Sequence, residues 1–273
     1  ILNFCETIAL IEFKYYIIVC ILPTIDLKEK FMNNNRFMSG ANAQATQIDV
    51  GLRAYMLGVY NHMTTALAFT GLMAMGLNFL AISNGALTPI GELFFLSPLK
   101  WVIMLAPLGM VFYISARLNN MSAGKARNMF YIYAGLMGLS LSSLLLVYTG
   151  ESVIRVFFIT SAAFASLSIY GYTTKKNLSA FGSFLIMGVF GIMIASIVNI
   201  FLGSEGLAFI ISILGVLIFA GLTAYDTQKI KNMYLAGDDI EISGKKTVMG
   251  ALTLYLDFIL MFQFLLMFLG NRE

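Results

Sequence analysis

Residues 248–270 read VMGALTLYLDFILMFQFLLMFLG, and Asp257 is the one charged side chain in this run. About 20 apolar residues are enough for an α-helix to cross the hydrocarbon core of a bilayer. Backbone groups in lipid have to be hydrogen-bonded within the segment, so the run predicts a transmembrane helix. It is continuously apolar rather than alternating, which argues against a strand of a membrane β-barrel.

Six further apolar runs precede it, separated by short gaps with turn signals such as Ser83-Asn84-Gly85 and Gly203-Ser204. The predicted transmembrane segments are 54–80, 98–117, 128–149, 152–173, 179–202, 206–227 and 248–270. We therefore predict an all-α integral membrane protein. Its single membrane domain, residues 54–273, holds seven transmembrane helices and follows a cytoplasmic N-terminal segment at residues 32–53.

The composition supports this prediction. Of the 273 residues 59% are hydrophobic and 11% are charged, whereas soluble domains carry about a quarter charged residues. A net charge of +3 gives no indication of nucleic-acid binding. The two cysteines, Cys5 and Cys20, precede all seven segments, and His62 is the one histidine. The bundle therefore has no disulfide framework and no zinc site of Cys or His ligands.

The distribution of Lys and Arg predicts the orientation in the membrane, because cytoplasmic loops carry an excess of both. Seven crossings place on one side Lys28, Lys30, Arg36, Arg53, Arg117, Lys125, Arg127, Lys175, Lys176, Lys229, Lys231, Lys245 and Lys246. The other side carries Lys100, Arg155 and Arg272. We expect a multi-pass protein of the cell inner membrane with a cytoplasmic N-terminus and an external C-terminus.

Residues 1–31 differ from the rest of the chain. Glu6, Glu12, Lys14 and Pro23 interrupt them, and the run from residue 15 to residue 25 is too short to span a bilayer. There is no basic region followed by a small-residue cleavage site, so a signal peptide is not expected. We expect an N-terminal extension that is not native, with Met32 or Met38 as the initiator. The alternative is an interfacial segment.

Asp257 is the first candidate functional residue. It lies ten residues beyond Thr247, or about 15 Å along a helix, close to the bilayer midplane. A carboxylate there costs about 2.5–3.5 kcal/mol on insertion scales unless it is protonated, and such residues commonly mark functional sites. The alternative is a neutral aspartic acid that is hydrogen-bonded to a neighbouring helix, for example to Asn199.

Asp226 ends the apolar part of the preceding segment, and topology puts both aspartates in the cytoplasmic half. An ion pair with Lys229 on the same helix face is the alternative reading. If the two carboxyl groups meet, they do not both ionise easily and would share a proton. The pair would then be a pH-responsive, oxygen-rich site of the kind that Ca²⁺ prefers.

Two further side chains are candidates of a weaker kind. Arg117 ends the second segment on the same side and would pair with an ionised aspartate as a latch. The alternative is an arginine that extends to the membrane surface. For His62, within the first segment, we favour a packed neutral histidine over a titrating one.

Several stretches of the chain resemble the Bax inhibitor-1 family, the transmembrane BAX inhibitor motif proteins. They are FAGLTAYDTQKIK at 219–231, ALTLYLDFILMFQFLLMFLGN at 251–271, GLRAYMLGVYNHM at 51–63, LMGLSLSSLLLVYTG at 136–150, GSFLIMG at 182–188 and NIFLG at 199–203. The resemblance covers residues 48–273 and is greatest to the bacterial inner-membrane branch.

The resemblance implies seven helices, with the last at the centre and wrapped by the other six. It also implies a pH-sensitive Ca²⁺ leak, with Asp226 and Asp257 as the family's paired aspartates and Arg117 as its second-helix arginine. The family's basic cluster after that helix is thinned here to Arg117 followed by Leu118 and two asparagines. We expect Ca²⁺ as a permeant or transiently bound ion, no tightly bound cofactor, and lipid as a partner.

The same residues argue against two other classes of membrane protein. Intramembrane aspartyl proteases carry Gly-x-Gly-Asp at the second aspartate, where this chain has Leu254-Tyr255-Leu256-Asp257, and no Pro-Ala-Leu motif follows. A retinal protein needs a lysine in its last helix, and residues 247–270 have none. We therefore do not expect an enzyme. A regulator of membrane proteins or membrane proteases, without transport of its own, remains as the alternative.

Overall fold

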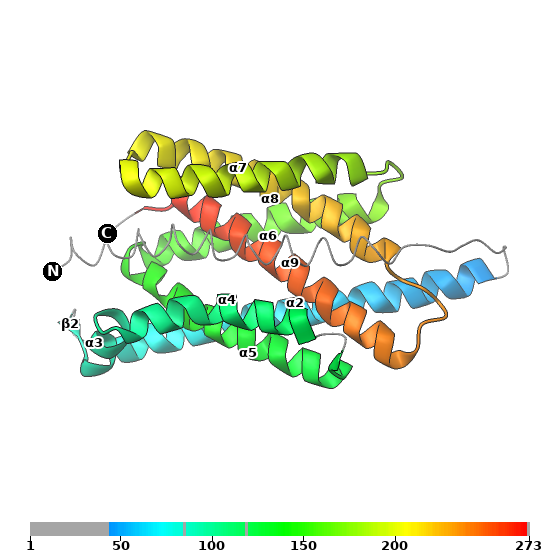
Figure 1. Cartoon of the computed structure of the whole chain (residues 1–273), viewed down its shortest axis with the longest axis horizontal. Helices are drawn as coiled ribbons and strands as arrows, with labels where there is room; N and C mark the ends of the chain where they lie inside the picture. Colours follow the sequence, from blue (N-terminus) through cyan, green and yellow to red (C-terminus); the bar gives the residue numbers. More distant parts are fainter. Residues whose placement is uncertain (1–43, 84–85, 118–119, 272–273) are drawn as a thin grey trace.

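The computed structural model describes residues 44–83, 86–117 and 120–271, and helices dominate this part of the chain (Figure 1). The elements in chain order are α2 Gln44–Ala81, β1 Ile82–Ser83, β2 Ala86–Leu87, α3 Pro89–Phe95, α4 Leu99–Arg117, α5 Ala123–Leu141, the 3₁₀ helix η2 Ser142–Leu146, α6 Gly150–Thr173, α7 Ser179–Leu202, α8 Glu205–Asn232 and α9 Ile240–Leu269. The expectation for residues 1–31 lies outside the described residues.

The all-α membrane fold is confirmed. In the described part of the chain, six helices are long and apolar enough to cross a membrane, and there are seven if the bent pair of α3 and α4 counts as one span. Four of the seven predicted segments lie wholly within helices, and the segments 98–117, 128–149 and 248–270 extend one to three residues beyond a helix end. The second predicted segment, 98–117, differs most from its prediction, because α3 precedes it and the two helices are bent by 57°.

Local sequence explains this bend. Pro98 has no backbone N–H and disfavours helical geometry at the residue before it. Helix α3 therefore stops at Phe95, and α4 begins at Leu99, whose N–H donates to Ser97 Oγ at 3.1 Å. Ahead of α3 the chain reverses in the antiparallel pair of β1 and β2, where Ile82 is opposite Leu87.

Helices α8 and α9 are longer than the apolar runs that predicted them. The predicted segments began at residues 206 and 248, whereas the helices begin at Glu205 and Ile240. Helix α8 also continues to Asn232, five residues beyond its apolar part. Helical hydrogen bonding continues where the chain enters a polar environment, so an apolar run marks the membrane part of a helix rather than its ends.

Helix α9 is the centre of the bundle. In its most apolar window 78% of the residues are buried, against 56% in the next most buried span. Its main packing partners are α2, α5, α6 and α8, while α4 packs on α5 and α7 packs on α8. Figure 1 shows α9 crossing the bundle diagonally. The predicted central last helix is thus confirmed, with α4 and α7 as an outer pair.

Aromatic contacts attach α9 to its neighbours on three sides. Tyr255 packs edge-on against Phe130 of α5 with ring centroids 5.6 Å apart, and Tyr255 Oη lies 2.8 Å from Thr70 Oγ1 of α2. Phe258 packs edge-on against Phe164 of α6 at 5.5 Å. Such pairs add about 0.5–1.5 kcal/mol each beyond the area they bury.

Gly171 is a point of close backbone contact between α6 and α8. A Cβ on Gly171 would overlap the backbone carbonyl of Ala224. Small residues let helix backbones approach closely in membranes, and here the approach holds α8 against α6 just before Asp226. By contrast, a Cβ on Gly191 of α7 would meet no atom within 4 Å.

These two glycines give a matched test of the packing. We expect Gly171→Ala to lower the stability by about 1–3 kcal/mol, because the new methyl group meets backbone that cannot move aside. Gly191→Ala is expected to be neutral or to stabilise by up to about 1 kcal/mol through helix propensity. Thermal unfolding in detergent measures both. Equal melting temperatures for the two variants would contradict the close α6–α8 contact.

Candidate functional site

Asp226 and Asp257 are both completely buried, each with 0% of its surface exposed. Asp226 lies near the end of α8, and Asp257 lies in the middle of α9, within the continuous buried stretch from Val248 to Leu266. Helices α8 and α9 form the most extensive helix–helix contact in the described structure. The two aspartates therefore come from the two helices that pack most closely in the centre of the bundle.

The register of α8 and α9 sets the relative position of the aspartates. The rings of Phe219 and Phe264 are stacked with centroids 5.7 Å apart. Seven residues forward along α8 from Phe219 is Asp226, and seven residues back along α9 from Phe264 is Asp257. Seven residues make about two turns, or about 10 Å, so each aspartate lies on the same side of its helix as its phenylalanine.

The two helices remain in contact beyond the aspartates. A Cβ on Gly250 of α9 would meet Ile230 of α8. The antiparallel pair is thus packed at Phe219–Phe264 on one side of the aspartate level and at Ile230–Gly250 on the other. The register consequently brings Asp226 and Asp257 to one level of the interface, which their separation in sequence did not determine.

The neighbours of Asp226 on α8 point to other helices. Tyr225 lies against Gly182 of α7, since a Cβ on Gly182 would overlap its ring. Thr227 points to α6, where its Oγ1 is 2.9 Å from Ser168 Oγ. With its neighbours directed at α7 and α6, Asp226 is left on the side of α8 that faces α9.

Three hydroxyl groups form a directed chain beside the pair, which sequence reasoning missed. Thr227 Oγ1 donates to the Thr223 carbonyl at 2.7 Å, so it accepts from Ser168. Ser168 has one hydrogen, so it in turn accepts from Tyr60 Oη at 2.6 Å. The chain crosses from α2 through α6 to α8, and no spacing in the sequence identifies it.

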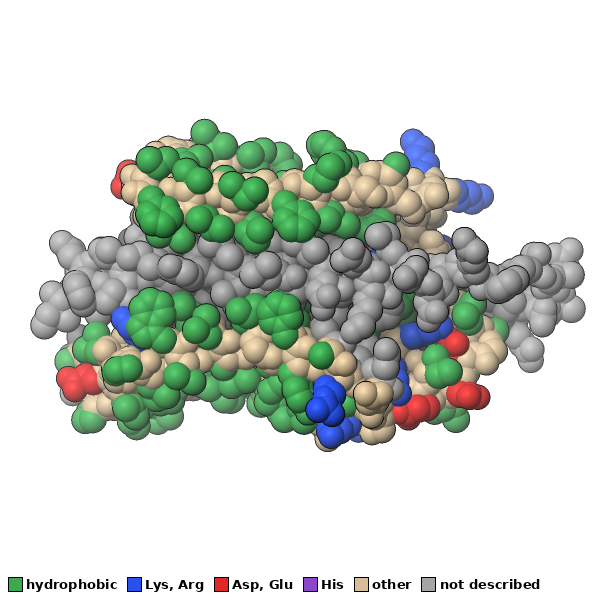
Figure 2. Space-filling model, in the orientation of Figure 1, with side chains coloured by type: hydrophobic (Ala, Val, Ile, Leu, Met, Phe, Trp, Pro, Cys, Tyr) green, Lys and Arg blue, Asp and Glu red, His purple; other side chains and the backbone are tan. Residues whose placement is uncertain are grey.

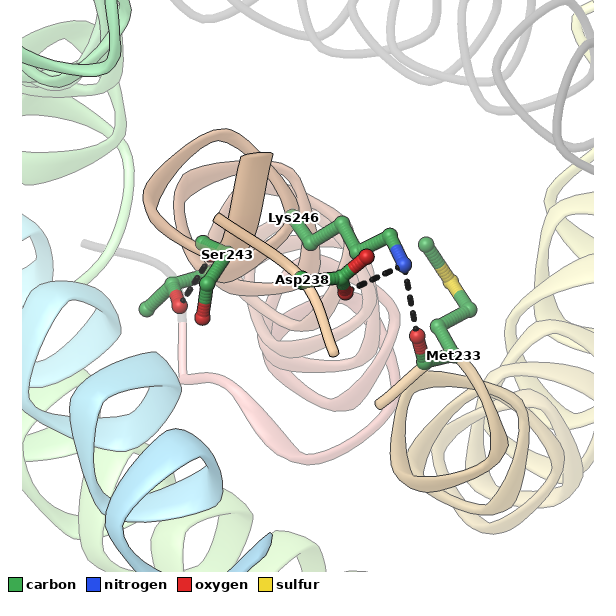
Figure 3. A network of polar contacts seen from close by, with 5 residues as sticks. Met233, Asp238, Ser243 and Lys246 are labelled. Atoms are coloured by element: carbon green, nitrogen blue, oxygen red, sulfur yellow. Dashed lines mark hydrogen bonds and ion pairs between the residues drawn. The ribbon is translucent and has the colours of Figure 1, made fainter. Parts of the chain in front are cut away.

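A polar network fixes the turn between α8 and α9 (Figure 3). Lys246 Nζ pairs with Asp238 Oδ2 at 2.6 Å and donates to the Met233 carbonyl at 3.0 Å. Met233 is the C-cap of α8 and Lys246 lies in the second turn of α9. The network therefore attaches the end of one helix to the start of the next and helps to hold their register.

Gln263 is a further polar residue of the central helix. Its side chain is completely buried, and its amide has no hydrogen-bond partner among the described residues. It stands in the same apolar run as Asp257, and a polar residue in such a run is itself a signal of an interior position. Sequence reasoning did not use this signal.

Arg117 and His62 are the two remaining candidate residues. Arg117 is exposed at the end of α4, whose main partners are α3 and α5. A latch between Arg117 and the aspartates therefore stays a prediction. His62 Nδ1 is 2.7 Å from Tyr131 Oη on α5, so the half-buried ring is hydrogen-bonded between helices.

The number of possible ligands near the aspartates decides whether they could form a complete calcium site. Ca²⁺ takes six to eight oxygen ligands in proteins. In the described part of the chain, no three His, Cys, Asp or Glu side chains gather into a metal-binding group. A contact of Asp226 and Asp257 with Ca²⁺ therefore stays a prediction, and the described residues add no third acidic ligand to the pair.

A family model and several individual proteins each match most of this chain. A family model described as "Inhibitor of apoptosis-promoting Bax1" matches residues 52–273. An uncharacterized protein of Rickettsia prowazekii is 48% identical over 82% of this chain and 92% of its own length. "Inner membrane protein YbhL" of Escherichia coli K12 is 43% identical over 82% of this chain and 94% of its own length.

A double-mutant cycle tests whether Asp226 and Asp257 lie at the same level of the α8–α9 interface. We expect Asp226→Asn and Asp257→Asn to be non-additive in stability by at least about 0.5 kcal/mol, because groups in contact couple. The control pairs Asp257→Asn with Asp239→Asn at the exposed N-cap of α9, about 25 Å away along the helix, where the effects should add. Thermal unfolding of the four variants measures both cycles. Additivity for Asp226 and Asp257 would contradict their contact.

Proposed function

The chain belongs to the Bax inhibitor-1 family, and on this premise we propose that it is a pH-sensitive passive calcium leak, gated by Asp226 and Asp257. The observation that carries the proposal is the complete burial of both aspartates in the two helices that pack most closely. Ionisable residues in such positions are costly, and they mark ion paths and proton relays in membrane proteins.

The proposed switch follows from the chemistry of two carboxyl groups in one desolvated site. Two negative charges in such a site would repel each other strongly because little water is present, and in this proposal the two carboxyl groups share one proton. Loss of that proton adds a charge at the α8–α9 interface. Because the interface is closely packed, the added charge changes how these helices fit together, and that change would open or close the path.

Calcium fits the proposal as the permeant ion. It is a hard cation that prefers oxygen ligands and tolerates irregular geometry. A leak requires an ion to bind well enough to enter and weakly enough to leave. Two carboxylates without a third acidic ligand in the described residues meet that requirement better than a complete binding loop would.

The chain is a multi-pass membrane protein, and the proposal places it in the inner membrane with its N-terminus in the cytoplasm. Support comes from the printed name of the Escherichia coli relative, "Inner membrane protein YbhL". Further support comes from charge: most of the Lys and Arg side chains visible in Figure 2 gather at the end of the bundle where α8 ends and α9 begins.

Calcium flux into proteoliposomes tests the function. Wild-type protein should carry Ca²⁺ at a rate that changes with pH, and Asp257→Asn should abolish that pH dependence because one member of the pair no longer titrates. Asp239→Asn is the matched control, since it removes an exposed carboxylate at the N-cap of α9 that makes no capping hydrogen bond, and it leaves the pair intact.

Two results would contradict the proposal in different ways. Wild-type flux and pH response in Asp257→Asn would exclude gating by the pair. Absence of Ca²⁺ flux in the folded wild-type protein would exclude the leak itself and favour a regulator of other membrane proteins, which a stoichiometric membrane partner in the purified sample would support.

A further inference from the structure

A groove runs along the outside of the bundle between α2 and α6. Its volume is about 710 Å³, within the range of about 300–1,000 Å³ that is usual for ligand sites. Side chains of α2 and α6 form its walls, and Phe258 of α9 forms part of its floor. Leu57, Phe157 and Ile169 line it and are exposed, so the groove opens sideways out of the bundle.

The groove is placed where lipid surrounds the protein. Both walls belong to helices that are long and apolar enough to span a membrane. Along α2 it extends from Arg53 to Ala68, which is about 22 Å at 1.5 Å per residue. One leaflet with its headgroup region measures about half of 40–45 Å. The groove therefore has the length of a single lipid molecule in one leaflet.

Four hydroxyl groups of the groove wall already donate hydrogen bonds within the protein. Tyr60 donates to Ser168, and Ser168 donates to Thr227 behind the wall. Thr64 Oγ1 donates to the Tyr60 carbonyl at 2.9 Å, and Ser161 Oγ donates to the Phe157 carbonyl at 2.8 Å. Because these four hydroxyl hydrogens are already used, the middle of the groove suits a hydrocarbon chain rather than a polar ligand.

Positive charge marks one end of the groove. Arg53 lines that end and is exposed. Lys231 Nζ lies 5.0 Å from the ring of Tyr172, another lining residue, and donates to its carbonyl. Among the described residues no carboxylate forms an ion pair with Arg53 or Lys231. Both cations are therefore available to an anionic group, and basic pockets between transmembrane helices commonly hold lipid headgroups.

We propose that the groove between α2 and α6 is a binding site for one anionic phospholipid from the surrounding bilayer. Its phosphate lies at Arg53 with Lys231 nearby, and one acyl chain follows the apolar walls to the level of Ala68. The site is separate from the aspartate pair, and its occupancy does not depend on whether the chain conducts calcium.

Native mass spectrometry of the purified full-length protein tests this site. Equal amounts of phosphatidylglycerol, which is anionic, and phosphatidylcholine, which has no net charge, are added in detergent. The wild type should retain one phosphatidylglycerol per chain in preference to phosphatidylcholine. Each cation near an anionic headgroup changes affinity about fivefold, so Arg53→Gln should reduce the preference about fivefold. Arg127→Gln removes an exposed arginine at the start of α5 and should behave as wild type.

A second set of variants tests the groove itself. Ala165→Phe places a ring in the groove and should remove bound lipid of both kinds, and Ser161→Phe does the same from one turn earlier if Ala165→Phe does not melt cooperatively. Wild-type preference in Arg53→Gln, or wild-type occupancy in a folded groove-filling variant, would overturn the proposal. Equal retention of both lipids by the wild type, or a peptide in place of lipid, would also overturn it.

Discussion

Hydrocarbon does not solvate charged or hydrogen-bonding groups, and the arrangement of this protein follows from that constraint. A helix that carries Asp257 and Gln263 in its apolar run cannot face lipid on every side. It is placed in the centre, where α2, α5, α6 and α8 surround it. The less polar α7 is free to take an outer position against α8. The long apolar segment that carries a carboxyl group in its middle is thus the most buried one.

The same constraint makes close packing of α8 and α9 important for the proposed gating. A buried carboxyl group is tolerated when its surroundings are fixed, and several features fix this pair. The Phe219–Phe264 stack sets the register on one side, and the Lys246–Asp238 pair closes the turn on the other. Gly171 brings α6 against α8 at the turn before Asp226. Loss of any of these would alter the environment of both aspartates at once.

The two proposed sites lie in different environments, one inside the bundle and one on its outer surface. The aspartate pair is desolvated by protein on all sides, so its chemistry depends on the protonation of two groups. The groove between α2 and α6 faces the bilayer, so its occupant is decided by shape and by the charge of Arg53. The hydroxyl chain through Ser168 lies between them and completes the hydrogen bonding of the groove wall without using the aspartates.

Run length alone determined the number and type of the transmembrane segments, because hydrocarbon accepts only helices with satisfied backbones. The free-energy cost of placing a carboxylate in hydrocarbon was enough to single out Asp257 in its run. Sequence did not determine where α8 ends or where α9 begins, since both helices extend beyond their apolar residues. Nor did it determine that Pro98 separates a short helix from the second span. Above all it left the position of Asp226 relative to Asp257 open. Packing between helices decided that position, because the register of two antiparallel helices depends on side chains that meet only in the folded bundle.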